Sequence, residues 1–216
     1  MGSQLLTAFY PEKCVLCEGL LKEDETDLCR SCREKVQEYP KGKFKISFVA
    51  RWTAIWYYKD GVRDSILRYK FLRRQRYGIV YGRLLAMKLL QSGMTEFDIL
   101  TWVPISFRRR WKRGFDQVAV IAKSVAKELG CEAKSTLKKT RHNQPQSRET
   151  SHAGRRANVL GAYRVKDAAS IKGKRILLID DIITSGATVS ECAKTLLSAG
   201  AKEVTCAAVA AADNSK

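Results

Sequence analysis

The segment from Ile176 to Val189, ILLIDDIITSGATV, places the strongest constraint on the fold of this chain. Its four leading aliphatic residues show no polar alternation, which is typical of a central parallel strand buried on both faces. Asp180 and Asp181 follow directly, and adjacent carboxylates at the edge of a core are costly without partners. A capped helix after a strand explains one of these aspartates at most. The segment therefore predicts a strand that leads into a ligand-binding site.

Small and hydroxyl-bearing residues follow the two aspartates and precede the apolar stripe of an expected helix: Thr184, Ser185, Gly186, Ala187 and Thr188. The backbone N–H groups of such a loop at a helix N-terminus favour a phosphate. Ionised carboxylates only accept hydrogen bonds, so they require hydroxyl donors or a hydrated cation. A phosphorylated ribose with a vicinal diol meets both demands. A paired-aspartate Mg²⁺ site of another phosphotransfer fold remains an alternative that explains the aspartates but not the loop.

The rest of the chain alternates strand and helix patterns, which predicts an α/β fold with a mainly parallel sheet flanked by helices. Strands are expected at 52–58, 99–103, 175–179 and 204–209, and helices at 61–70, 78–90, 116–129 and 188–199. Asp116 is the expected N-cap of the third helix. Residues 138–160 keep neither period and predict a long, mobile, basic loop.

Two cysteine pairs, Cys14-Val-Leu-Cys17 and Cys29-Arg-Ser-Cys32, bracket a polar loop of eleven residues. This spacing predicts four thiolates around one tetrahedral metal ion, with no open position for a substrate. The ion is therefore expected to be structural; zinc is preferred and iron stays open. A thioredoxin-like redox pair would need a single such motif beside a βαβ pattern. The remaining cysteines lie among apolar residues and are expected in the core: Cys131, Cys192 and Cys206.

The metal-binding segment suggests a division into a small domain at 1–43 and a main domain at 44–216. Charge is spread unevenly between these parts. Residues 1–43 carry 7 basic and 8 acidic side chains, and residues 167–216 carry 6 of each, whereas residues 44–166 carry 27 basic and 8 acidic ones. The whole excess belongs to the middle segment, which indicates an anionic partner.

No stretch approaches the roughly 18 apolar residues of a membrane span. The N-terminus also lacks a basic segment followed by a long apolar run, so no signal peptide is expected. These features predict a cytoplasmic protein without a membrane span.

The stretch from Ile176 to Thr188 resembles the signature for 5-phosphoribosyl 1-pyrophosphate (PRPP) of type I phosphoribosyltransferases. The resemblance implies that Asp180 and Asp181 bind the ribose hydroxyls and that the loop at 184–188 binds the 5-phosphate. It also implies that Mg²⁺ accompanies the pyrophosphate. A phosphoribosyltransferase-like parallel sheet flanked by helices is the fold expected from it.

Nearly the whole chain resembles the ComF family of competence-associated, phosphoribosyltransferase-like proteins. The resemblance is carried by the four cysteines and by Lys70-Phe71, Val103-Pro104-Ile105-Ser106, Arg108-Arg109-Arg110, Arg113-Gly114-Phe115-Asp116-Gln117, Pro145-Gln146, Arg155 and Asn158. By analogy with related enzymes, Val103, Pro104, Ile105 and Ser106 would form the pyrophosphate loop, and Lys70 would reach the same group. The segment 138–156 would be a flexible lid.

Basic residues assigned to nucleic-acid binding or to the lid are Arg108, Arg109, Arg110, Lys112, Arg113, Lys138, Lys139 and Arg141. The first five flank Phe107, Trp111 and Phe115, a mixture that suits a single strand whose phosphates pair with cations while its bases stack. In the alternative interpretation, the aromatic rings pack into the domain and the arginines simply face solvent.

The family's association with natural transformation implies a role in handling imported single-stranded DNA, with a competence helicase or other uptake proteins as partners. Contact with such partners would place the protein at the inner face of the membrane. Two hypotheses follow. One is a non-catalytic, zinc-bearing competence factor that binds PRPP, Mg²⁺ and single-stranded DNA. The other is an active phosphoribosyltransferase with an unidentified acceptor and no DNA role.

Overall fold

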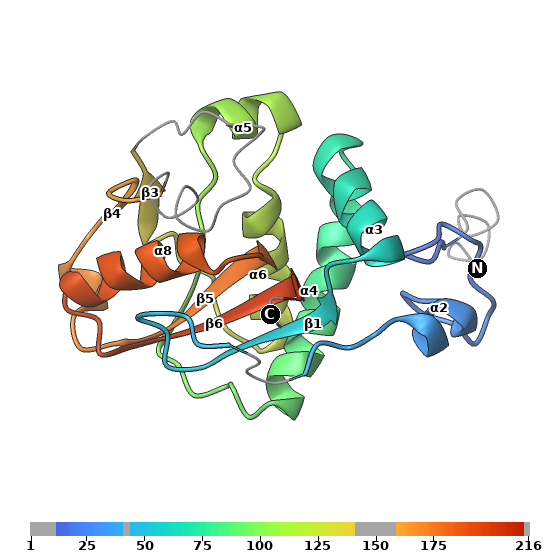
Figure 1. Ribbon diagram of the computed structural model, residues 1–216, viewed down its shortest axis with the longest axis horizontal. Helices are drawn as coiled ribbons and strands as arrows, with labels where there is room; N and C mark the ends of the chain where they lie inside the picture. The colour runs from blue at the N-terminus through green and yellow to red at the C-terminus, as the bar shows by residue number, and fades with distance from the viewer. Residues whose placement is uncertain (1–11, 41–43, 141–158, 214–216) are drawn as a thin grey trace.

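A four-stranded parallel sheet forms the centre of the molecule (Figure 1). The computed structural model describes residues 12–40, 44–140 and 159–213. The strands are β1 (Trp52–Tyr57), β2 (Ile99–Trp102), β5 (Arg175–Ile183) and β6 (Glu203–Ala211), in the spatial order β1-β6-β5-β2. The expected parallel α/β architecture is confirmed.

Helices cover both faces of this sheet (Figure 1). One face carries α3 (Asp60–Phe71), α4 (Gln75–Gln91) and α6 (Gln117–Glu128), while the other carries α8 (Ala187–Ser198). A short antiparallel hairpin of β3 (Leu137–Lys139) and β4 (Tyr163–Val165) lies on the α8 side, and a 3₁₀ turn, η1 (Ala169–Ile171), precedes β5. Each face of the sheet therefore has its own apolar core.

Strand register places the end of β5 beyond its neighbour. The four residues of β2 pair with Ile176–Ile179, and the Val103 N–H donates to the Ile179 carbonyl at 2.9 Å. Pairing with β6 continues on the other side as far as Ile183. The expected strand 175–179 is thus too short, because β6 supports β5 after β2 has ended. Asp180 and Asp181 lie within the strand, where it is paired on one side only.

Three further elements have no counterpart in the sequence expectations: α2 (Arg30–Lys35), α5 (Phe107–Arg113) and the β3–β4 hairpin. Neither α2 nor α5 buries a side chain, so neither has an apolar stripe from which the helix could be predicted. The expectation of three core cysteines holds for Cys192 and Cys206 and is wrong for Cys131. Cys131 follows the end of α6 in a turn and is exposed.

The cysteine-rich segment packs against α3 and α4 (Figure 1). Ser65 of α3 donates a hydrogen bond to the Val15 carbonyl and lies 2.6 Å from the Tyr81 hydroxyl, while Arg68 donates to the Leu16 carbonyl. The turn between the first two cysteines is therefore held by α3. The domain boundary at residue 43 stays a prediction, since residues 41–43 lie outside the described ranges.

Acidic residues of this segment also pair with basic residues of the two helices. Glu18 accepts from the Tyr77 hydroxyl at 2.9 Å and lies 3.3 Å from Arg74. Asp27 accepts from Arg83 Nε at 2.9 Å, and Glu38 lies 2.7 Å from Lys88. The acidity of the N-terminal segment thus complements the basic helices on which it lies.

Candidate functional site

The two aspartates of β5 are both buried, with exposed fractions of 6% for Asp180 and 7% for Asp181. A strand directs successive side chains to opposite faces of its sheet. Asp181 accordingly meets α3 and α6, while Asp180 lies toward the layer of α8 and the hairpin. Facing opposite layers keeps the two charges apart, which explains how a strand accommodates adjacent carboxylates.

Asp181 is held by two side chains. Lys70 Nζ, at the C-terminal end of α3, lies 3.0 Å from Asp181 Oδ1, and its side chain is only 14% exposed. Gln117 Nε2, on the first residue of α6, donates to Asp181 Oδ2 at 3.1 Å. Both oxygens of this carboxylate therefore have a partner, and Asp181 links the end of α3 to the start of α6.

Asp180 has a different environment. Its Oδ1 accepts the Asp181 N–H at 2.8 Å. Burial raises the pKa of Asp180 well above the usual carboxyl value, and the neighbouring charge of Asp181 adds to the rise. The Asp181 N–H, Lys70 and Lys139 oppose this effect without cancelling it. One carboxylate of the pair is thus held by fixed partners, while the other resists ionisation.

The expected phosphate loop lies between the end of β5 and α8. Gly186 is the N-cap of α8 with φ +74°, a conformation that suits glycine, and it provides no side-chain cap for the first helical N–H groups. Ser185 Oγ accepts the Ala187 N–H at 3.5 Å, a weak contact. A Cβ atom added at Gly186 would lie 3.1 Å from Ile46 Cγ1, so this side chain supports the loop from behind. A helix start that is capped by glycine and lacks a side-chain cap is suited to an anion.

The residues expected to form the pyrophosphate loop connect β2 to α5, beside the free edge of β5. Val103 is buried, while Pro104 and Ile105 are partly exposed. Ser106 Oγ caps α5 by accepting the Arg109 N–H at 3.4 Å. Lys70, which was expected to reach the same pyrophosphate, pairs with Asp181.

Helix α5 presents its aromatic and basic side chains to solvent. Phe107 is 74% exposed and Trp111 79% exposed, while Phe115, beyond the helix, is buried. At a spacing of four residues, Phe107 and Trp111 lie on the same side of the helix. Packing into the domain therefore explains Phe115 but not the two rings on α5. The arginines at 108–110 and Lys112 are exposed as expected.

Two of the predicted nucleic-acid residues are half-buried near the carboxylates. The Arg113 guanidinium lies over the Phe71 ring, 5.4 Å from its centroid. Burial lowers the pKa of Arg113 against the raising influence of Asp181. Lys139 Nζ lies 3.2 Å from the Tyr163 hydroxyl, and burial lowers its pKa while Asp180 acts against the shift.

The other members of that group differ in their position. Lys138 points to solvent on β3. Arg141 and the part of the expected lid 138–156 that follows Thr140 lie outside the described residues. The described chain before and after these residues is linked by a hydrogen bond, in which the Thr140 N–H donates to the Ala162 carbonyl at 2.8 Å.

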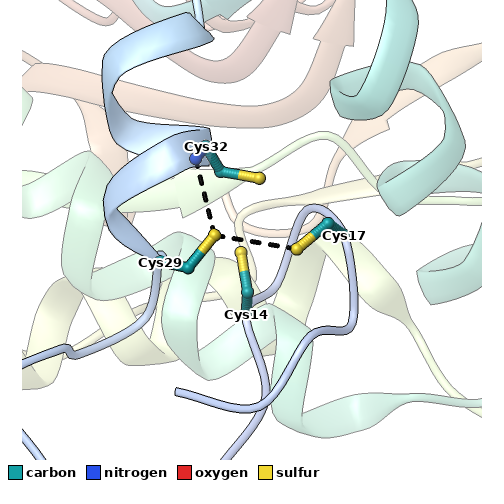
Figure 2. Close-up of side chains that lie close together, drawn as sticks. All are labelled: Cys14, Cys17, Cys29 and Cys32. Atoms are coloured by element: carbon teal, nitrogen blue, oxygen red, sulfur yellow. Dashed lines mark hydrogen bonds between the residues drawn. The ribbon is translucent and has the colours of Figure 1, made fainter. Parts of the chain in front are cut away.

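The four N-terminal cysteines converge on one point (Figure 2). Their sulfur atoms all lie within 4.8 Å of one another, and the Cys17 and Cys29 sulfurs are 3.7 Å apart. A tetrahedral zinc–thiolate site has sulfur–sulfur edges of about 3.8 Å, given Zn–S bonds of roughly 2.3 Å. The Gly19 N–H and the Cys32 N–H donate to Cys17 and Cys29, each at 3.4 Å. The cluster can therefore hold a metal such as zinc, with main-chain donors that support thiolates.

Gln117 and Tyr69 are the parts of the site that sequence reasoning missed. Gln117 belongs to the motif 113–117, but only its hydrogen bond to Asp181 identifies it as part of the candidate site. The Tyr69 hydroxyl donates to the Gln117 carbonyl at 2.7 Å and so joins α3 to the start of α6. The one available signal was the position of Gln117 directly after a helix cap. Its partner is distant in sequence, so no local pattern reveals the contact.

Comparison with known proteins agrees with this geometry. Residues 118–216 match the model of the phosphoribosyl transferase domain. The DNA utilization protein YhgH of Salmonella typhi is 32% identical over 140 residues, covering 62% of this chain and 60% of the relative, so the match spans about three-fifths of that protein's length.

Longer matches come from two further relatives. The competence protein ComFC of Streptococcus pneumoniae is 29% identical, and the match covers 87% of this chain and 77% of that relative. Competence protein F of Haemophilus influenzae is 23% identical, covering 91% of this chain and 95% of its own.

The parallel sheet, the matched domain and the four-cysteine cluster define a phosphoribosyltransferase-like protein with an N-terminal knuckle, residues 12–40, whose cysteines can hold a metal. The named relatives narrow the class further, because their similarity supports a ComF-family, phosphoribosyltransferase-like protein. None of the helices in the described ranges combines the length and apolarity that a membrane span requires.

Proposed function

We propose that this protein binds PRPP with Mg²⁺ at the carboxyl end of β5 and handles single-stranded DNA during natural competence. The observation that carries the first part is the juxtaposition of Asp180 and Asp181 with the glycine-capped start of α8. It offers carboxylates for a diol and backbone N–H groups for a phosphate within one strand–loop–helix unit. The names of the competence relatives support the second part.

In this proposal the aspartates accept hydrogen bonds from the ribose hydroxyls, and the loop at 184–188 binds the 5-phosphate. Residues 103–106 and Lys70 lie toward the pyrophosphate. Lys70 would then exchange its ion pair with Asp181 for a phosphate oxygen, or share itself between the two. Mg²⁺, when bound, supplies positive charge to the pyrophosphate, and hard carboxylate oxygens suit it.

An active phosphoribosyltransferase with an unidentified acceptor and no DNA role is the alternative. Its reaction would displace pyrophosphate from C1 of the ribose through an oxocarbenium-like state. Lys70 and the lid arginines would stabilise the departing charge, and a closed site would exclude water. His142 and His152 lie outside the described residues, so no general base is assigned.

Calorimetric titration of PRPP and Mg²⁺ tests the ligand site. The metal-loaded wild type should show saturable binding, and the Asp180→Asn/Asp181→Asn variant should lose it. Asp64→Asn, an exposed aspartate on α3, provides the matched control and should bind as the wild type does. A folded wild type that takes up no PRPP would refute this part of the proposal. Pyrophosphate release with candidate acceptors then separates the binding protein from the transferase.

The DNA part rests on α5, whose exposed rings alternate with cations. A helix that buries no side chain contributes little to the core, so its composition is more simply explained by a partner than by folding. Stacking on aromatic rings together with phosphate–cation pairs is the usual way to hold a single strand. A competence helicase or another uptake protein would be an additional partner, reached from the cytoplasmic side of the inner membrane.

Replacing Arg108, Arg109 and Arg110 with alanine should weaken single-stranded DNA binding and flatten its dependence on salt by up to roughly three phosphates' worth. The measurement is the slope of log affinity against log salt concentration. A matched triple variant, Lys172→Ala/Lys174→Ala/Lys202→Ala, removes three exposed charges near the amino ends of β5 and β6 and should keep the slope. Equal slopes in the two triple variants would show that single-stranded DNA does not bind to the arginines of α5.

A further inference from the structure

Gln117 contains a buried hydrogen-bond acceptor that the protein leaves unused. The residue is 2% exposed, and its Nε2 donates to Asp181. Its Oε1 has no hydrogen-bond partner among the described residues. A buried polar atom without a partner is unfavourable, and such atoms in native structures call for an explanation.

The orientation of this carboxamide follows from chemistry. An ionised carboxylate only accepts hydrogen bonds, so the NH₂ group of Gln117 must face Asp181 and the oxygen must face away. Exchanging the two atoms would set two acceptors against each other. The unpartnered oxygen therefore belongs to a group whose other end touches the candidate ribose-binding carboxylate.

The backbone of Gln117 is fixed on both sides. Asp116 caps α6 by accepting the N–H groups of Val118 and Ala119, each at 3.1 Å. The Tyr69 hydroxyl holds the Gln117 carbonyl at 2.7 Å. A residue held in this way is preorganised, so its acceptor can serve a ligand without first being ordered.

We propose that Gln117 is a specificity residue that reads one hydroxyl of the ribose diol. Nε2 fixes the orientation of Asp181, and Oε1 accepts a hydrogen bond from that hydroxyl. The inference rests on the proposed PRPP site and names a residue that distinguishes the sugar. The contact with Asp181 accounts for the NH₂ group of the amide, whereas its buried oxygen has no partner among the described residues.

The consequence is discrimination between sugars. A site with a buried group that expects a hydroxyl rejects an analogue without it, because the group is left unpaired. The protein should therefore prefer ribose phosphates over one of the corresponding deoxyribose phosphates. Removal of the amide should weaken the preference by lowering affinity for ribose more than for that deoxy sugar.

The test compares Gln117→Met with the wild type, using PRPP titration followed by competition with ribose 5-phosphate, 2-deoxyribose 5-phosphate and 3-deoxyribose 5-phosphate. One neutral hydrogen bond corresponds to about a threefold to tenfold change in affinity. We expect Gln117→Met to lose ribose affinity by about that factor and to lose discrimination against one deoxy sugar. Gln75→Met makes the same change at the exposed first residue of α4 and should alter neither.

Thermal unfolding of both variants verifies that they fold. Unchanged discrimination against both deoxy sugars in folded Gln117→Met would overturn the inference, even with weaker overall binding. A wild type that binds no PRPP would instead refute the proposed ligand site. The two failures are therefore distinguishable.

Discussion

At the scale of single residues, the two aspartates of β5 are neighbours in sequence with different surroundings. Asp181 has both oxygens engaged by Lys70 and Gln117, and it lies on the α3 and α6 side of the sheet. Asp180 lies toward α8, where burial and the adjacent charge oppose its ionisation. The pair thus combines a fixed, ion-paired carboxylate with one that holds its proton more strongly.

The raised pKa of Asp180 predicts how stability varies with pH. The native state keeps this proton to a higher pH than the unfolded chain does, so stability falls as pH rises through the range between the two values. Asparagine carries no such charge. Asp180→Asn should therefore be more stable than the wild type at neutral pH, with a higher melting temperature.

Thermal unfolding across a pH series checks this prediction. The advantage of Asp180→Asn should shrink toward acid pH, below the ordinary carboxyl pKa, where Asp180 is protonated in both states. The exposed Asp64→Asn variant should show no comparable advantage. Equal melting temperatures of Asp180→Asn and wild type at neutral pH would contradict the assigned environment of Asp180.

Sequence reasoning located these residues better than it described their contacts. The aspartate pair at the end of a buried strand, the start of α8 and the Asp116 cap were readable because each depends on neighbours in the chain. Opposite orientation of the aspartates was also implicit in a strand, but the strand was expected to end at residue 179. The partners of Asp181 come from α3 and α6, and such long-range contacts leave no local pattern.

At the scale of elements, α4 and α6 are packed unusually closely through two glycines of α4. A Cβ atom added at Gly82 would lie 2.3 Å from Ser124 Cβ and 2.8 Å from the Ile121 carbonyl. One added at Gly78 would lie 2.3 Å from the Tyr69 hydroxyl, the group that holds Gln117. Glycine normally weakens a helix interior, so its use here reflects the close approach.

Gly82→Ala should therefore destabilise the protein by about 1–3 kcal/mol, as expected for overpacking, although alanine is the better helix former. Chemical denaturation measures the difference. Gly61→Ala is the matched control, because Gly61 lies in α3 with open space around it. That variant should lose no stability, because an added methyl group meets no atom there. Similar effects of the two substitutions would show that α4 and α6 are not in such close contact.

Element prediction succeeded where burial imposed a period. The strands and long helices of the main domain each present an apolar face, and their expected positions agree with the structure to within a few residues. Helix α5 was missed because it has no buried face; its cap Ser106 and its terminal Gly114, with φ +80°, were the only local signals. Helix α2 was missed for the same reason: it is short and buries no side chain, and its N-cap is Cys29 of the cysteine cluster.

At the scale of the whole molecule, the acidic knuckle and the basic helices form one electrostatic unit. Glu18, Asp27 and Glu38 pair with cations of α3 and α4, so part of the positive excess is neutralised internally. Composition revealed the asymmetry of charge but not this pairing, because the partners are distant in sequence. Helix α5 contributes four exposed cations that remain available to an external anion: Arg108, Arg109, Arg110 and Lys112.

Loss of the metal should therefore affect more than the knuckle. Cys29→Ser should lose the bound metal, lower the melting temperature and weaken PRPP binding, because the turn at 14–17 holds α3 and α3 carries Lys70. Atomic emission, thermal unfolding and calorimetry measure the three effects. Cys131→Ser changes an exposed cysteine outside the cluster and should leave all three unchanged. Full metal content in Cys29→Ser would refute the prediction that four thiolates bind the metal.

The strand order also dictates when the sheet can form during synthesis. Strand β1 pairs with β6, with Trp52 opposite Cys206, so nearly the whole main domain separates the two partners. Such long-range parallel pairing slows folding, because much chain must be ordered before the contact is made. Until β6 leaves the ribosome, β1 and β5 remain apolar strands without their shared neighbour. Nascent chains should consequently depend on chaperones until the last strand is made.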